Sequence, residues 1–298
     1  MIGIFQNKNL TLDKWRKIED KHLSNAKTLI DKAKKKSSDK IEPLCKCLCE
    51  ALKISNIDDL FIANYNKLHK LKELCDNLNY LEHNINFGYM KELFEELYKQ
   101  YRKSYGKELV EDLELQVCPY CNRNFINNTG KYATSQFDHF FPKSKYPMMA
   151  LSLYNLIPCC PQCNHIKGEH AIDYSPYNKN FTTDQLLEFE AVPISVNDFS
   201  VEINAKSSII EKNISVLLLN NAYEIHNDLA KELYLKTKMY TDSYKESLDG
   251  IFQSSGLNIA MTLEEIYFGN FFTEEKYYLR PLSKFTRDIV VEFQKLAH

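Results

Sequence analysis

Two Cys-x-x-C pairs constrain this chain more than any other feature of its sequence. The first pair is Cys118-Pro-Tyr-Cys121 and the second is Cys160-Pro-Gln-Cys163, with 38 residues between them. Each pair presents two thiolates from one tight turn, and a structural zinc site needs four ligands arranged as a tetrahedron. We therefore predict a structural Zn²⁺ held by all four thiolates. The alternative, four cysteines buried in an apolar core, explains neither the matched spacing nor the prolines within the pairs.

Composition supports a folded protein in a reducing compartment. The 298 residues suggest about two domains. The chain is 44% hydrophobic and 26% charged, which is ordinary for a protein with a buried core. No stretch approaches the apolar length of a membrane span, and the N-terminus lacks the pattern of a secretory signal. We therefore expect a cytoplasmic protein without a membrane partner, whose nine cysteines are not paired as disulfides.

Charge is distributed unevenly along the chain. The net charge is −2, but basic residues outnumber acidic ones by five in residues 1–50, and acidic residues outnumber basic ones by seven in residues 181–298. Bulk charge therefore does not indicate a nucleic-acid partner, and such a partner would need a local basic surface.

The pattern of apolar residues predicts a mainly α fold with a small central insert. Residues 1–116 have the periodicity of helices, and residues 181–298 are mostly helical, with a short strand at 199–203 and an amphipathic helix after Pro281. Residues 117–180 differ, because they are rich in cysteine, proline and turn signals. Within them, Asn124–Ile126 and Tyr132–Phe137 flank an Asn-Asn-Thr-Gly turn, which predicts a hairpin. We therefore expect a small central module, held together by the structural zinc, between two mostly helical regions.

Four polar residues lie between or directly after the cysteine pairs. Asp138 and His139 are adjacent, Asn155 follows in Leu-Tyr-Asn-Leu-Ile-Pro, and Asn164 follows the last cysteine. Alone, His139 would be an ordinary half-buried histidine, and Asn155 a turn residue bonded to its own backbone. Together, and bracketed by the cysteine pairs, they closely resemble the HNH endonuclease (ββα-metal) family. The resemblance implies a two-stranded hairpin and a helix that hold one catalytic divalent cation.

The resemblance also implies a role for each of these residues. His139 would be the general base that deprotonates the attacking water, and Asn155 would brace the loop that carries it. Asp138 and Asn164 would bind the catalytic cation. Oxygen ligands of this kind favour Mg²⁺ or Mn²⁺ over softer metals. His165, one residue out of register, is not expected to be a ligand.

Several basic residues near this motif could contact the phosphates of a nucleic acid. Such contacts need only charge and reach, so each of these residues could equally be a solvated surface charge. The candidates are Lys143, Lys145, Lys167 and Arg123.

A longer stretch of the sequence resembles one bacterial subgroup of the HNH family. Asp-His-Phe-Phe-Pro-Lys-Ser-Lys-Tyr-Pro and the two motifs after it are similar to HNH proteins encoded beside ATPases in anti-phage systems such as Septu and related retrons. The resemblance implies an HNH endonuclease acting on nucleic acid, DNA first, as the nuclease effector of a defence complex with an ATPase partner. Two alternatives remain open at this point. One is an HNH effector that cleaves RNA such as tRNA, and the other is a non-catalytic zinc-stapled subunit for nucleic-acid binding or assembly.

Overall fold

The N-terminal part of the chain consists of helices that begin at short polar capping residues. In the computed structural model, which describes residues 1–130, 132–256 and 261–297, the side chains of Thr11, Asn64 and Asn86 each accept a hydrogen bond from the backbone N–H three residues on. Such caps satisfy N–H groups that have no partner inside the helix. The mainly helical fold predicted from the sequence is confirmed. The helices are α1 (Leu12–Lys36), α2 (Ser38–Ala51), α3 (Asp58–Phe61), α4 (Tyr65–Asp76) and α5 (Phe87–Asp112).

The contacts between residues divide the chain into two units, each assembled from separate stretches. The first unit contains Met1–Lys8, Gln116–Phe125 and Lys179–His298. The second contains Asn9–Leu115 and Ile126–Asn178. This grouping describes contacts in space, whereas the three regions 1–116, 117–180 and 181–298 describe order along the chain, and that division stays a prediction.

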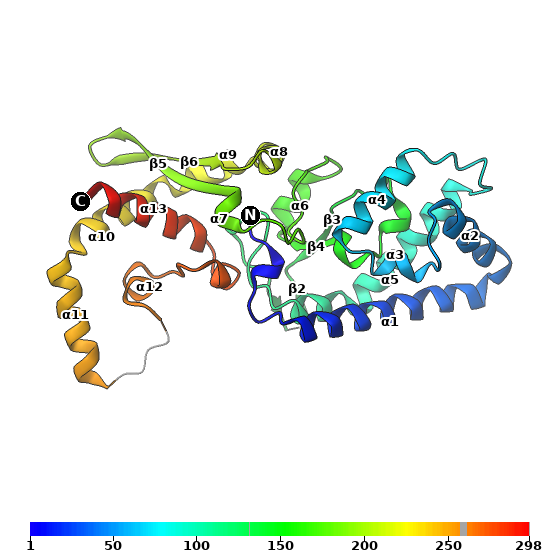
Figure 1. Ribbon diagram of the computed structural model, residues 1–298, viewed down its shortest axis with the longest axis horizontal. Coiled ribbons are helices and arrows are strands. Elements are labelled where there is room, and N and C mark those ends of the chain that lie inside the picture. The colour runs from blue at the N-terminus through cyan, green and yellow to red at the C-terminus, as the bar shows by residue number, and fades with distance from the viewer. Residues whose placement is uncertain (131, 257–260, 298) are drawn as a thin grey trace. The chain divides into compact units, whose positions relative to one another are not determined.

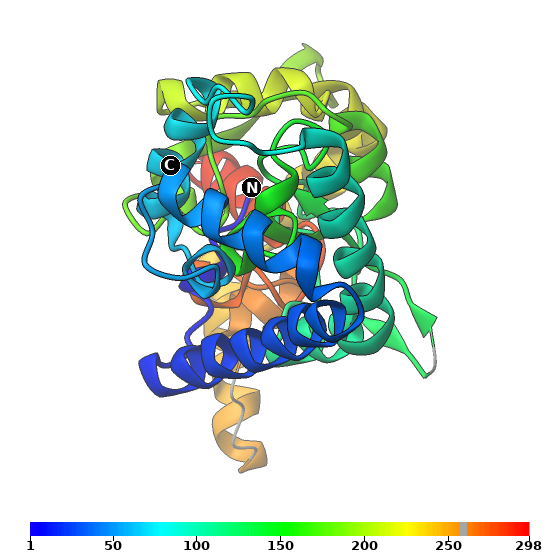
Figure 2. The same ribbon diagram turned by 90° about the vertical axis from the view of Figure 1, so that its right-hand side faces the viewer.

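The second unit carries a strand pair followed by a short helix. Strand β3 (Gln136–His139) pairs antiparallel with β4 (Leu156–Cys159), and α6 (Pro161–Lys167) begins directly after β4. The loop between the strands contains the 3₁₀ turns η2 (Pro147–Met149) and η3 (Leu153–Asn155). Within the same unit α1 packs against α5, and Figures 1 and 2 show these helices from two directions. The ββα arrangement implied by the sequence is therefore β3, β4 and α6.

The hairpin predicted on either side of the Asn-Asn-Thr-Gly turn is wrong in extent. In the structure β1 (Asn128–Thr129) pairs with β2 (Tyr132–Ala133), while Phe137 belongs to β3 and pairs with β4. Residues 124–126 form no strand, although Phe125 makes an isolated bridge to Val117. Phe137 pairs instead with Pro158 of β4, about twenty residues away, and all four residues of β4 are buried, which favours this pairing over a short local hairpin.

The first unit is built around a two-stranded antiparallel sheet. Strand β5 (Leu187–Ser195) pairs with β6 (Asp198–Ala205), so the strand predicted at 199–203 is confirmed and its partner was not anticipated. Helix α13 (Ser283–Ala297) packs on β5 through Phe285, whose ring meets that of Phe189 with centroids 5.6 Å apart. The other helices are α7 (Thr183–Leu186), α8 (Ser208–Val216), α9 (Leu219–Tyr223), α10 (Asn227–Met239), α11 (Asp242–Ser255) and α12 (Leu263–Phe268), with the 3₁₀ turns η1 (Ile4–Gln6), η4 (Glu224–His226) and η5 (Glu274–Lys276).

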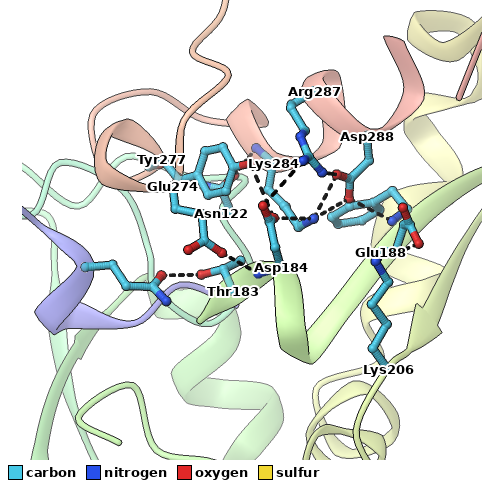
Figure 3. Close-up of polar contacts among 12 residues, drawn as sticks. Asn122, Thr183, Asp184, Glu188, Lys206, Glu274, Tyr277, Lys284, Arg287 and Asp288 are labelled. Carbon is cyan, nitrogen blue, oxygen red and sulfur yellow. Dashed lines mark hydrogen bonds and ion pairs between the residues drawn. The ribbon is translucent and has the colours of Figure 1, made fainter. Parts of the chain in front are cut away.

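A buried group of charged residues fixes the start of α13 in this unit (Figure 3). The ammonium of Lys284 is 1% exposed and lies 2.7 Å from carboxylate oxygens of both Asp184 and Asp288. Arg287 pairs with Asp288 at 2.8 Å, and the Phe189 backbone N–H donates to the same carboxylate at 3.0 Å. Burial raises the pKa of Asp288. Each buried charge therefore has an opposite charge beside it, which a buried ion needs in order not to destabilise the fold.

None of the helices among the described residues is long and apolar enough to cross a bilayer, and the two longest, α1 and α5, carry charged residues along their whole length.

Candidate active site

The four cysteines of the two Cys-x-x-C pairs come together in the structure. All four side chains are buried, and their Sγ atoms lie within 4.8 Å of one another. A tetrahedral zinc ion with sulfur ligands at about 2.3 Å requires sulfurs about 4 Å apart, so the spacing fits a closed four-thiolate site. The predicted zinc-binding arrangement of cysteines is confirmed. Cys159, next to Cys160, lies in β4 opposite Gln136 and is buried as a packing residue, as expected from the spacing.

Backbone hydrogen bonds hold each cysteine pair in a tight turn. In the first pair, the Arg123 N–H donates to Cys121 Sγ at 3.4 Å and the Asn122 N–H donates to the Cys118 carbonyl at 2.8 Å. In the second pair, the Cys163 N–H donates to Cys160 Sγ at 3.4 Å, and Cys160 is the N-cap of α6. N–H groups directed at sulfur favour the thiolate form that a metal requires.

Asn122, which the sequence did not single out, anchors the first cysteine pair. It has a left-handed backbone with φ +53° and is almost completely buried. Its Nδ2 donates to the Tyr277 carbonyl at 2.9 Å, and its own carbonyl accepts from the Leu282 N–H at 2.6 Å. The start of the C-terminal helix thus supports the turn after Cys121. The one available signal was the residue type, since Asn tolerates the left-handed conformation better than other non-glycine residues.

Asp138 and His139 occupy the end of β3, where both are buried. The carboxylate of Asp138 is paired with Lys167, which lies in the last turn of α6 and is 0% exposed. Lys167 Nζ donates to Asp138 Oδ1 at 3.0 Å and to the His139 carbonyl at 2.9 Å. This placement argues against the predicted phosphate contact by Lys167, because its ammonium is enclosed and already used in holding the end of β3.

The imidazole of His139 is held in one orientation from two sides. Its Nε2 donates to the Ala150 carbonyl at 3.1 Å, which leaves Nδ1 as the acceptor nitrogen of the neutral ring. The ring of Tyr98 from α5 meets it edge-on, with centroids 4.5 Å apart. Burial, with help from Lys143, lowers the pKa of His139 to about 3, so the imidazole is neutral at physiological pH.

Asn155 ties together the loop that follows His139. Its Oδ1 accepts from the Phe141 N–H at 2.7 Å, and its Nδ2 donates to the carbonyls of Phe141 at 3.1 Å and Met149 at 3.0 Å. The side chain is 0% exposed, so these bonds are made away from water. The contacts are those expected of a residue that braces the loop.

Asp138, His139 and Asn164 line one cleft, which has a volume of about 630 Å³. Asn164 Nδ2 donates to Gln136 Oε1 at 2.6 Å, an arrangement that leaves Oδ1 as the acceptor end of the Asn164 amide. A carboxylate and an amide oxygen are suitable ligands for Mg²⁺ or Mn²⁺ when water and a phosphate complete the shell. The residue types facing the cleft therefore fit a hard divalent cation.

The other predicted basic residues differ in what they contact. Lys143 lines the cleft and lies 4.8 Å from the centroid of the Tyr98 ring. Lys145 instead forms an ion pair with Asp76 at 3.1 Å and is two-thirds exposed. Arg123, in the first unit, donates through Nε to His226 Nε2 at 3.2 Å. Of the four candidates, Lys143 is thus the one that the structure brings to the cleft beside His139.

Sequence comparison shows that the stretch containing the four cysteines is similar to a known family. Residues 118–170 match the family model described as HNH endonuclease. This stretch of the chain is similar to an HNH domain. This match includes both cysteine pairs and all four residues discussed above as Asp138, His139, Asn155 and Asn164, so the family resemblance predicted from the sequence is confirmed.

The chain is also similar to a curated bacterial defence protein. It is 34% identical over 68 residues to "Septu protein PtuB" of Bacillus thuringiensis, which covers 23% of this chain and 25% of that protein. The chain thus spans about a quarter of the length of the curated relative it matches. No solved structure shows a significant match.

Proposed function

We propose that this chain is a metal-dependent HNH endonuclease that hydrolyses phosphodiester bonds in nucleic acid, with DNA as the first substrate to test. One observation carries the proposal. His139, whose imidazole is fixed by the Ala150 carbonyl, lines the same cleft as Asp138 and Asn164, and all three lie within the residues that match the HNH family. These are the groups that phosphodiester hydrolysis needs: a base and ligands for a Lewis acid.

His139 would accept the proton of the attacking water at Nδ1. The hydrogen bond from Nε2 to Ala150 fixes the tautomer, and the Tyr98 ring limits rotation of the imidazole. Asn155 would act indirectly, because its hydrogen bond to Phe141 holds the loop that follows His139. The expected products carry a 5′-phosphate and a 3′-hydroxyl.

Asp138 and Asn164 would hold the catalytic Mg²⁺ or Mn²⁺, since both line the cleft and both side chains carry oxygen atoms. When bound there, the ion would supply charge stabilisation to the phosphate and the leaving oxygen. Lys167 would keep Asp138 in place through the ion pair that joins α6 to β3. Lys143 would contact the phosphate of the bound strand. Zn²⁺ on the four cysteines would stabilise the module without taking part in the chemistry.

The similarity to a Septu protein supports a wider role in anti-phage defence. We propose that the chain is the nuclease subunit of such a system in the bacterial cytoplasm and works with an ATPase partner. RNA, including tRNA, remains the second candidate substrate because its phosphodiester chemistry is the same. A non-catalytic nucleic-acid binding or assembly subunit is the alternative outside the enzyme class.

The test is cleavage by the purified chain with and without divalent metal. Plasmid DNA and total RNA are each incubated with Mg²⁺, Mn²⁺ or a chelator, and the ends of any product are mapped. The proposal expects cleavage of at least one nucleic acid that requires added metal and leaves 5′-phosphate ends. Absence of cleavage in all conditions, from protein that contains zinc and binds nucleic acid, would favour the binding-only alternative.

A further inference from the structure

One wall of the cleft comes from a helix that lies outside the family match. Residues Lys91, Glu95, Tyr98 and Arg102 of α5 line the same cleft as Asp138 and His139. Their spacings of four, three and four residues place them on one face of the helix. The HNH match begins at residue 118, so this wall is an addition from the N-terminal helical region.

The wall carries two cations, Lys91 and Arg102, and one carboxylate, Glu95, so its formal charge is +1. Within residues 1–130, 132–256 and 261–297, the structure gives Lys91, Arg102 and Lys143 no ion pair with a carboxylate, whereas Lys145 and Lys167 each have one. Burial lowers the pKa of Lys143, and the charges of Lys99 and Arg102 lower it further while Glu95 opposes them. The cleft is also lined by three carboxylates, but Asp138 is paired with Lys167, so the three cations outnumber the other two, Glu95 and Glu169, by one and favour the arrival of an anion.

The length of the wall suits a nucleic-acid strand. Lys91 and Arg102 are eleven residues apart, which in an α-helix is about 16 Å. One strand of a duplex advances about 3.4 Å per phosphate along its axis, so the wall runs beside about four or five phosphates. Tyr98 lies between the two cations, covered by Lys143 on one side and by the His139 imidazole on another. A strand held along α5 would therefore pass the proposed base.

We propose that the face of α5 formed by Lys91 and Arg102 binds the sugar–phosphate backbone of the substrate strand and, with Lys143, guides it to His139. The proposal rests on the proposed nuclease function for the identity of the ligand. It assigns to the N-terminal helices a direct part in substrate binding, and the contacts are to backbone phosphate, so they carry no sequence preference.

Binding is measured on a non-cleaving background, which separates this proposal from the nuclease proposal. Full-length His139→Ala protein is titrated with fluorescently labelled DNA duplex, single-stranded DNA and RNA over a series of salt concentrations. Arg102→Gln and Lys91→Gln are then introduced singly. Each lost phosphate contact lowers the salt slope of log K by about 0.9 on duplex or about 0.7 on a single strand. When the salt is raised from 50 to 200 mM, a variant that lacks one contact should therefore lose about threefold less affinity than the parent does.

Lys103→Gln is the matched control, because Lys103 is the next residue on the same helix, is exposed, and does not line the cleft. We expect its salt slope to equal that of the parent. The proposal would be overturned if the salt slopes of Arg102→Gln and Lys91→Gln equalled that of Lys103→Gln on every nucleic acid that binds. It would also be overturned if none of the three nucleic acids bound at 50 mM salt. If the α5 variants reduce the salt slope but the protein with His139 intact cleaves no nucleic acid, the result would support binding by this face of α5 and contradict the nuclease proposal.

Discussion

Replacing Lys167 by methionine tests whether this lysine supports the fold or contacts substrate. Its ammonium is 0% exposed and bonds Asp138 Oδ1 at 3.0 Å and the His139 carbonyl at 2.9 Å. Methionine fills a similar volume but leaves the carboxylate of Asp138, itself 3% exposed, without its buried cation. Removing one partner of a buried ion pair costs about 3–5 kcal/mol in the free energy of unfolding.

The effect should be visible as a shift in urea denaturation. With a slope of roughly 3 kcal/mol per molar urea for a protein of this size, the midpoint should fall by about 1–2 M. The chain has one tryptophan, and Trp15 is buried in the same unit as Lys167, with its Nε1 donating to the Tyr154 hydroxyl at 2.8 Å. Tryptophan fluorescence therefore reports the unfolding of that unit.

Two further variants sharpen the result. Lys143→Met is the matched control, because Lys143 is half-buried and makes no ion pair with a described carboxylate, so its midpoint should move by less than about 0.5 M. The double variant Asp138→Asn, Lys167→Met removes both charges and should be less destabilised than the sum of the single variants. A Lys167→Met protein with an unchanged urea midpoint and weakened nucleic-acid binding would refute the reasoning and restore the phosphate contact expected from the sequence.

Three other predictions follow from the buried groups of the two units. Asn155→Ala should cost about 3 kcal/mol in the free energy of unfolding, because it removes three buried hydrogen bonds, and a urea midpoint equal to that of the parent would contradict the bracing role. Burial lowers the pKa of His22 to about 4, below its unfolded value, so the unfolded state binds the proton more tightly and stability should fall as pH drops from about 6.5 to 4. Relative to His22→Gln, the parent should lose about 3 kcal/mol over that range in urea denaturation at each pH, and parallel profiles would show that His22 is not buried as a neutral ring. Cys118→Ser should abolish zinc binding in elemental analysis and unfold the module by circular dichroism, whereas Cys47→Ser, at a half-buried position outside the cluster, should change neither; a folded, zinc-free Cys118→Ser protein would argue against the metal site.

Features that depend on local spacing could be predicted from the sequence. The two Cys-x-x-C pairs each form a single turn, so their spacing alone indicated which four cysteines meet. Three residues of the family motif, Asp138, His139 and Asn164, likewise line the cleft because β3 pairs with β4 and α6 begins directly after β4. Helices with clear apolar faces, such as α5 and α13, could also be predicted, since their periodicity reflects the side that packs.

Features that depend on pairing across the chain could not be predicted. In the sequence, nothing distinguishes Lys167 from an ordinary basic surface residue. It is buried against Asp138, 29 positions earlier, only because α6 packs next to β3. The α5 wall was missed for a similar reason. The sequence showed which face of that helix was apolar, but not which polar residues would turn towards a cleft formed by residues 137–169. The prediction of a hairpin at 124–137 failed because a local turn signal competed with a longer-range strand pair, in which all four residues of β4 are buried.

The most direct test of the central claim is the rate of metal-dependent cleavage by His139→Ala. General-base catalysis by a positioned histidine is worth about 10²–10⁴ in rate, so the variant should cleave at least a hundredfold more slowly than the parent. Its zinc content should stay the same, because His139 lies outside the four-cysteine cluster. His170→Ala removes an exposed histidine from the same unit and should cleave at the parental rate. A His139→Ala protein that cleaves within about threefold of the parent, under conditions where His170→Ala does the same, would contradict the account.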